Sequence, residues 1–368
     1  MGQRAKAGTR LASLVKMAVP LCQRAERECP RKGPGRKPDI PDWVLAVLIM
    51  VAILKRKKSK SGQYRFLAEH RRELQAWMGT SAFPARSTYF DRYRRAHRLF
   101  QHAVMLQGRV AIEEGVTDVT TVAVDKSLMA ARGPLWHASD RKRNRIPKGL
   151  HGVDRDSEWG CSKHDGWVQG YSFEVVVSAT KHSTVFPLLA SAGTASVKET
   201  QTFDAKIDEL PEETKHVTAD SGYDSNHLGE RIEGTAGGKR TGRRFLCPEN
   251  KRGSKPKSRR KAVQPRDESH RRRLARRKFY KSRRGRAIYR RRSQTVEPFN
   301  EWFKSLLELD LVFGIADWKT IKPSCWRRCS RTSYSFATTT AVVEKTARSG
   351  GSLICSEFPD TLRYLHYE

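Results

Sequence analysis

The pattern of apolar positions divides the chain into a helical first part and a mixed second part. Between residues 42 and 115, apolar side chains recur at the three- and four-residue spacing of helices. The longest apolar run, residues 43–54, is too short to span a bilayer and predicts a buried helix. Pro84 then marks a break before a basic helix. We therefore expect a helical, helix-turn-helix-like DNA-binding domain over residues 42–115, an outline that any small helical bundle also shares.

From residue 116 the pattern changes to that of a sheet. Runs rich in β-branched residues at 117–127, 167–180 and 182–193 predict strands. Residues 215–233 predict a strand, a turn and a helix. Early strands followed by a strand–helix alternation indicate an α/β core with a mixed sheet.

The last clear element is the helix in TVEPFNEWFKSLLELD. Its apolar positions, among them Val296, Phe299 and Phe303, form one face. Proline fits a helix best in its first turn, so Pro298 predicts that the helix begins just before it.

The charge of the chain points to a polyanionic partner. The formal net charge is +33 over 368 residues, well beyond the small excess that keeps a protein soluble. Residues 239–292 hold 25 Lys or Arg and three acids. A concentrated basic segment is typical of a nucleic-acid-binding surface, and an anionic membrane surface is the alternative.

The first residues and the cysteines bear on location. Residues 1–41 are basic and contain Pro and Gly, so we expect a flexible arm there. The first 40 residues lack the apolar core and cleavage site of a signal peptide. Seven widely spread cysteines predict no disulfide framework. We therefore expect a cytoplasmic, reduced protein with no membrane segment.

Three carboxylates stand out by their context. Asp125 closes the predicted strand TVAVD, Asp220 closes HVTAD, and Glu297 lies in the first turn of the last clear helix. If the three converge, a divalent cation such as Mg²⁺ would neutralise their repulsion. Two such ions would stabilise both oxygens of a phosphoryl displacement. With 39 acids in the chain, a chance arrangement is the alternative, and Glu297 also suits the positive end of a helix.

Four sequence blocks follow one another in order: TVAVDKSLMAARG, WGCSKHDGWVQGYSFEVVVSATK, TADSGYDSN and YRRRSQTVEPFNEWFK. Together they resemble the DDE-type insertion-sequence transposases, in the group whose type member is insertion sequence four. The resemblance covers about residues 116–310. It implies a ribonuclease-H-like α/β fold, a mixed sheet flanked by helices, as the catalytic domain over residues 116–313. It also implies a basic insertion at about 225–290, before the last catalytic helix.

The resemblance assigns roles residue by residue. The catalytic, metal-binding triad would be Asp125, Asp220 and Glu297. The residues that contact DNA near the scissile phosphate would be Tyr289, Arg292 and Lys304. Six residues separate Glu297 from Lys304, as in the family pattern. Four residues separate Arg292 from Glu297, where the family pattern has three.

The resemblance also implies a reaction and partners. The reaction would be cut-and-paste transposition, in which metal-dependent hydrolysis at the element's ends frees a 3′-hydroxyl that attacks target DNA. The cofactor would be two Mg²⁺ ions, for which Mn²⁺ can substitute. The partner would be double-stranded DNA, held by a homodimer in a synaptic complex in the bacterial cytoplasm at the nucleoid. Two alternatives are an inactive DNA-binding remnant and a related ribonuclease-H-like nuclease without strand transfer.

The pattern is lost after Leu311. Residues 314–368 show no helical periodicity, although the resemblance implies apolar helices there. Read in the frame that starts on the third base of each codon, the residues from Phe313 onward are compatible with an amphipathic helix. We therefore hypothesise a frameshift near residues 311–313, which the nucleotide sequence would test. An unusual but genuine tail is the alternative.

Overall fold

The computed structural model describes residues 2–29, 38–55, 57, 59–93, 96–131, 133–162, 165–234, 241–250 and 267–307. The tail at 314–368, with its hypothetical frameshift, lies outside these residues. So do residues 235–240 and 251–266 of the expected basic insertion.

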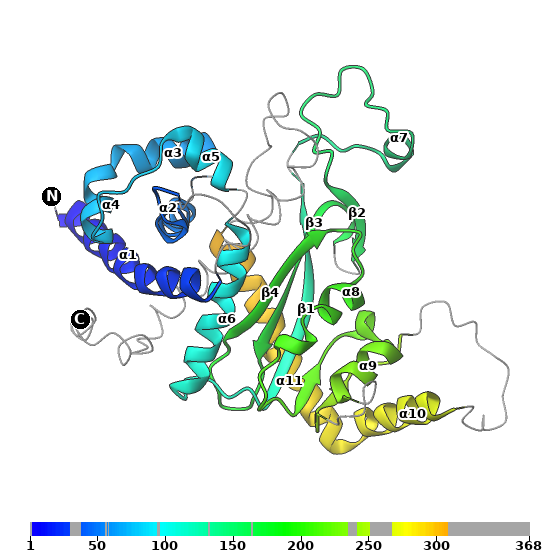
Figure 1. Ribbon diagram of the computed structural model, residues 1–368. Helices are drawn as coiled ribbons and strands as arrows, with labels where there is room; N and C mark the ends of the chain where they lie inside the picture. Colours follow the sequence, from blue (N-terminus) through cyan, green and yellow to red (C-terminus); the bar gives the residue numbers. More distant parts are fainter. Residues whose placement is uncertain are drawn as a thin grey trace.

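Six helices form the first part of the chain (Figure 1). They are α1 (Gly2–Glu28), α2 (Asp42–Leu54), α3 (Lys60–Glu69), α4 (Arg71–Met78), α5 (Arg86–Tyr93) and α6 (His97–Glu113). Every residue of α2 from Val44 to Ile53 is buried, which confirms the predicted buried helix and explains its unbroken apolar sequence. Among the described residues, no helix is long and apolar enough to cross a membrane.

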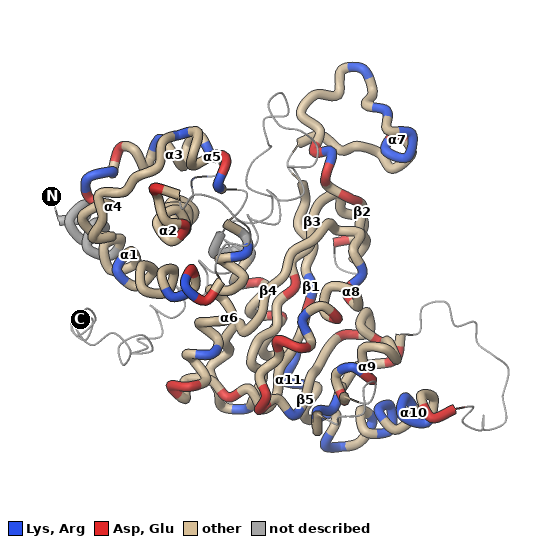
Figure 2. Tube along the Cα trace, viewed as in Figure 1, with Lys and Arg blue, Asp and Glu red and all other residues tan. Residues whose placement is uncertain are grey.

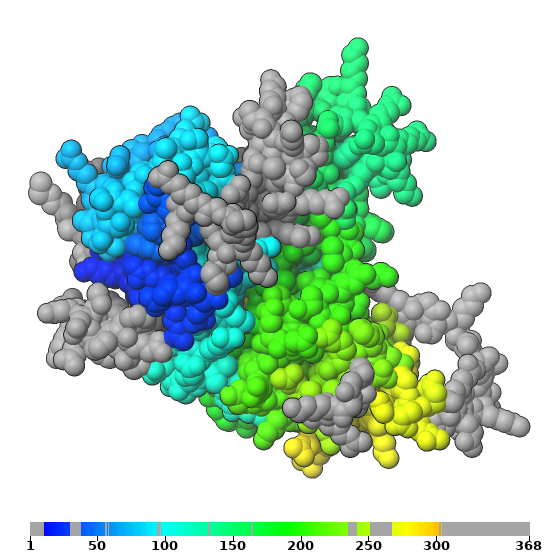
Figure 3. All heavy atoms as spheres, viewed as in Figure 1, coloured from blue at the N-terminus to red at the C-terminus, as the bar shows by residue number. Residues whose placement is uncertain are grey.

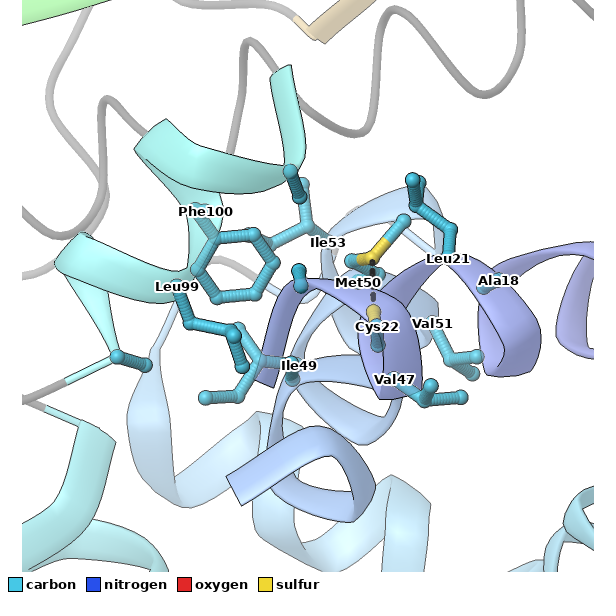
Figure 4. Close-up of a cluster of buried hydrophobic side chains, with 14 of the residues drawn as sticks. Ala18, Leu21, Cys22, Val47, Ile49, Met50, Val51, Ile53, Leu99 and Phe100 are labelled. Atoms are coloured by element: carbon cyan, nitrogen blue, oxygen red, sulfur yellow. Dashed lines mark hydrogen bonds between the residues drawn. The ribbon is translucent and has the colours of Figure 1, made fainter. Parts of the chain in front are cut away.

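Helix α1 corrects the expectation of a flexible arm over the described residues before 30. Its apolar positions, spaced three and four apart, form a buried stripe that runs from Leu11 through Val15 to Ala25. This stripe packs against α2 and α6, and Figure 4 shows Cys22 of α1 lying against Met50 of α2. The basic residues of the segment obscured this stripe, and those whose side chains are described, Lys16, Arg24 and Arg27, lie on the other faces of the same helix.

The second part is built on a six-stranded mixed sheet. Its strands are β1 (Thr121–Ala130), β2 (Glu158–Ser162), β3 (Gly166–Ser178), β4 (Pro187–Thr194), β5 (His216–Thr218) and β6 (Arg244–Leu246). Strand β1 is central, antiparallel to β3 and parallel to β5, and β6 continues the parallel side. Both β2 and β4 pair with β3, along different parts of its length. This mixed α/β arrangement is consistent with a ribonuclease-H-like core and confirms the predicted strands.

Alternation along the strands gives the sheet two apolar faces. The face that includes Ala123 and Val175 shares one core with α11 (Arg283–Leu307) and the six N-terminal helices. The face that includes Val122 and Val176 packs against α8 (Glu199–Asp204) and α9 (Asn226–Glu233). The space-filling view shows α6, in cyan, directly against the green strands (Figure 3).

Helix α11 crosses β1, β3 and β5 and is longer than its sequence pattern predicted. It begins at Arg283, so Pro298 lies in its interior and Glu297 does not lie in its first turn as expected. Pro298 is on the exposed side, where water can hydrogen-bond the carbonyl that the missing N–H leaves free. The preceding helix α10 (Glu268–Lys281) meets α11 at a tight corner, where a Cβ on Gly285 would lie 2.0 Å from the Phe279 carbonyl oxygen.

Candidate active site

Asp125 lies on β1, and Asp220 lies level with it, two residues after the end of the neighbouring parallel strand β5. The register aligns Ala123 of β1 with Thr218 of β5, and each acid follows two residues later. Adjacent strands are about 4.8 Å apart, and equal spacing from aligned residues directs both side chains to the same face, the one that α11 covers. The sequence suggested that Asp125 closes its strand. Instead, β1 continues past Asp125 to Ala130, whereas β5 ends at Thr218, before Asp220.

A single guanidinium joins two of the three predicted carboxylates. Arg292 of α11 donates through Nη2 to Asp125 Oδ1 at 2.6 Å and through Nη1 to Glu297 Oε1 at 2.8 Å. The Arg292 side chain is 10 % exposed and that of Asp125 is 17 % exposed, whereas that of Glu297 is 52 % exposed. Asp125 and Glu297, far apart in the sequence, therefore share one largely buried cation.

The electrostatics of the site follow from this burial. Burial is the largest influence on Asp125 and raises its pKa from 3.8 to about 6, with Asp220 and Glu297 adding to the rise and Arg292 opposing it. Burial also disfavours the charge on Arg292, but the nearby carboxylates outweigh it and raise the pKa of the guanidinium. The site thus concentrates negative charge where solvation is poor, which favours a bound cation.

Asp220 is held by its own loop. Its Oδ1 accepts a hydrogen bond from the Gly222 N–H at 2.8 Å, which caps the short 3₁₀ turn Ser221–Tyr223. A Cβ at Gly222 would lie 1.7 Å from Glu199 Oε2, so glycine lets the carboxylate of Glu199 approach this loop. Glu199, at the start of α8, is a neighbouring acid that the sequence patterns did not single out.

The opposite face of the sheet holds a second buried acid. Glu174 of β3 is 3 % exposed and lies beside Lys126 in the β1–β3 pairing. The Tyr223 hydroxyl donates to Glu174 Oε2 at 2.7 Å. Burial outweighs this bond and raises the pKa of Glu174 from 4.5 to about 8. Glu174 comes directly before the apolar run Val175–Val177 in an ordinary strand pattern, so no local pattern indicated this environment.

The remaining predicted residues lie elsewhere on α11. Tyr289 is partly buried, with its ring edge-on to Tyr280 of α10 at a centroid distance of 5.0 Å. Burial raises the pKa of Tyr289 above its usual range. Lys304 belongs to α11, but its side chain is outside the described part of the structure. Asn300, which the sequence did not single out, donates from Nδ2 to Asp125 Oδ2 at 2.8 Å.

The carboxylate oxygens of the site are the type of ligand that a divalent cation requires. Asp125, Asp220 and Glu297 are the hard oxygen donors that Mg²⁺ prefers, and two of them already share a cation in Arg292. In the arrangement seen, however, no three His, Cys, Asp or Glu side chains of the described ranges are grouped as metal ligands. The guanidinium of Arg292 lies between the carboxylates that would hold the ion.

Comparison with known families identifies the same region. The sequence model of the family described as "Transposase DDE domain" matches residues 115–313, which is more than half of the chain. No curated protein matches the chain.

Proposed function

Because the chain belongs to the transposase DDE domain family, we propose that it catalyses cut-and-paste movement of a DNA element. In the proposed reaction, a phosphodiester at the element's end is hydrolysed, and the freed 3′-hydroxyl then attacks a phosphodiester of target DNA. The observation that carries this proposal is the shared guanidinium of Arg292, which brings Asp125 and Glu297 together on the face where Asp220 also lies.

Asp125, Asp220 and Glu297 would hold Mg²⁺, or Mn²⁺ in its place. When bound, the ion would supply Lewis acidity at the phosphate and a nucleophilic hydroxide at neutral pH. The carboxylates of the chain would orient the ion. Arg292 would leave them and donate to a phosphate oxygen, since its planar fork of N–H groups fits phosphate as well as carboxylate.

The basic helix α10 would bind the DNA backbone. Figure 2 shows Lys and Arg along this helix, and within it none of the residues is buried. Arg273 and Arg277 both reach Asp224, at 3.2 and 3.5 Å, in the loop that follows Asp220. These ion pairs attach α10 to the loop of the site, so DNA lying along α10 would pass close to the carboxylates. Contacts of this kind give affinity that falls with salt.

Helices α4 and α5 would dock double-stranded DNA. Helix α4 ends at Gly79, which has φ +66°, and a short turn leads into α5. Arg71 of α4 and Arg86 and Ser87 of α5 are exposed. A pair of short helices with exposed basic and hydroxyl side chains can contact both phosphates and base edges.

The test uses the full chain and a supercoiled plasmid that carries its gene with the native flanking DNA. We expect Mg²⁺-dependent cleavage at the flanks and joined products with a second plasmid. Asp125→Asn and Asp220→Asn should abolish cleavage and change DNA affinity in a gel-shift assay by less than about twofold. The control is Asp208→Asn, which removes an exposed carboxylate and should cleave normally. Cleavage by Asp125→Asn would refute the proposal, and cleavage without joining would indicate a nuclease.

A further inference from the structure

Asn300 lies on the buried face of α11 and contacts the site directly. It is 7 % exposed and donates from Nδ2 to Asp125 Oδ2 at 2.8 Å. Arg292, two turns earlier on the same helix, donates to the other oxygen, Oδ1. Helix α11 therefore satisfies both oxygens of Asp125, one with a guanidinium and one with an amide.

The other end of the same amide is buried without a partner among the described residues. A carboxylate oxygen accepts hydrogen bonds, so the amide nitrogen faces Asp125 and the carbonyl oxygen Oδ1 faces away from that bond. Oδ1 is fully buried and has no hydrogen-bond donor in the described part of the chain. An unsatisfied buried acceptor destabilises the protein, which marks Oδ1 as a position where a ligand would be stabilised.

Covalent geometry and charge narrow the class of that ligand. The amide oxygen and nitrogen share one carbon, so Oδ1 lies within about 5 Å of Asp125 Oδ2. A DNA phosphate offers only acceptors and cannot satisfy a carbonyl oxygen. Asn300 contacts Asp125, and Asp220 follows the neighbouring strand at the same level, so the surroundings are negatively charged and a divalent cation is the ligand that fits. Amide carbonyls are among the oxygen ligands that such ions take in proteins.

We propose that Asn300 is a further residue of the metal site: Nδ2 positions Asp125, and Oδ1 is an additional oxygen ligand for the divalent cation. This proposal rests on the proposed function, which places the cation at Asp125. It adds to the three acids a neutral ligand that comes from α11, one turn after Glu297.

The test measures Mn²⁺ binding by the full chain without DNA, using the electron paramagnetic resonance signal of free Mn²⁺. Asn300→Leu keeps the size of the side chain and removes both polar atoms, and we expect about tenfold weaker Mn²⁺ binding. Asn300→Asp should bind Mn²⁺ more tightly than the unaltered chain, because it replaces a neutral oxygen with a charged one. A residue that only supported the fold would give no such gain. The matched control is Gln294→Leu, an exposed amide on the same helix, which should leave Mn²⁺ affinity unchanged.

The outcomes separate this proposal from the proposed function. If Asn300→Leu binds Mn²⁺ as well as Gln294→Leu does, Oδ1 is not a ligand. If thermal melting shows that Asn300→Leu does not fold, Asn300→Asp decides, and an unchanged or weaker affinity in that variant overturns the proposal. Asp125→Asn provides the reference: full Mn²⁺ binding by this variant would overturn both proposals. Loss of binding in Asp125→Asn with normal binding in Asn300→Leu would overturn only the role of Asn300.

Discussion

Replacing Arg292 should strengthen metal binding, although Arg292 belongs to the site. The guanidinium lies between Asp125 and Glu297 at 2.6 and 2.8 Å, so a metal ion must displace it before it can bind both carboxylates. Arg292→Met keeps much of the apolar stem and removes the charge. In the absence of DNA, which would otherwise attract Arg292, the variant should bind Mn²⁺ at least tenfold more tightly than the unaltered chain.

The magnitude follows from burial. Opposite charges about 4 Å apart interact by about 4 kcal/mol at the effective dielectric constant of a partly buried site. The pair of Arg292 with Asp125 is largely buried and comes near this value, whereas the half-exposed Glu297 adds about 1 kcal/mol or less. Since a tenfold change in affinity corresponds to about 1.4 kcal/mol, even half of the interaction between Arg292 and Asp125, about 2 kcal/mol, exceeds the predicted effect.

The same change should destabilise the metal-free protein. Removing one partner of a buried ion pair typically costs about 3–5 kcal/mol, because the other charge is left buried and alone. The loss in unfolding free energy should be larger at pH 8 than at pH 5, where Asp125, with its pKa raised to about 6, takes up a proton and no longer needs a counter-ion. Urea denaturation in EDTA at the two pH values measures this difference.

The matched control is Arg290→Met, which removes the same charge from an exposed position of α11. Mn²⁺ binding and urea denaturation are measured on both variants. Arg290→Met should leave both quantities nearly unchanged. If Arg292→Met binds Mn²⁺ no more tightly than Arg290→Met, then Arg292 does not compete with the metal and the reasoning is refuted.

Two further predictions concern the sheet. Because Glu174 has a raised folded-state pKa of about 8, its contribution to stability is fully present below its unfolded value of 4.5 and is lost as pH rises to about 8. As the pH rises over this range, the unfolding free energy of Glu174→Gln should therefore increase relative to that of the unaltered chain, by up to about 5 kcal/mol. Urea denaturation with EDTA measures this difference, and a difference that stays constant between pH 5 and 8 would contradict the prediction. A Cβ on Gly170 would lie 2.0 Å from the Met129 carbonyl oxygen, so Gly170→Ala should lower the unfolding free energy by about 1–3 kcal/mol. Gly193→Ala, whose Cβ would meet only ordinary contacts of 3.5 Å or more, is the control, and equal losses in the two variants would count against the explanation.

Local patterns predicted the elements whose burial is encoded in adjacent residues. The apolar run at 43–54 and the β-branched strands carry their environment in their own composition, and both lie where expected. Helix α1 was missed although its stripe, including Leu11 and Val15, has helical spacing, because the basic residues around it favoured a different interpretation. The three- and four-residue spacing of its apolar positions, considered without the surrounding charges, would have predicted this helix.

Other features depend on contacts that no local pattern contains. The start of α11 was misplaced because six of the ten residues in RRGRAIYRRR are Arg and obscure its few buried positions, such as Ile288. The pairing of Arg292 with Asp125 joins two segments far apart in the chain, and neither the local patterns nor the resemblance predicted it. Asn300 lies within the block YRRRSQTVEPFNEWFK but is not one of the residues to which the resemblance assigns a role, so only the packing of α11 on β1 reveals its contact with Asp125.

The core that the N-terminal helices share with the sheet and α11 has a consequence for where DNA would be cut. If the DNA-binding helices and the sheet were separate domains joined by a flexible linker, the recognised DNA could lie at many distances from the carboxylates. Here the same apolar cluster includes Tyr89 of α5, Val175 of β3 and Phe303 of α11, so moving α5 relative to the sheet would require breaking that cluster. If α5 docks on DNA, its distance from the carboxylates is therefore fixed. The number of base pairs between the recognised sequence and the cleaved bond would then be constant.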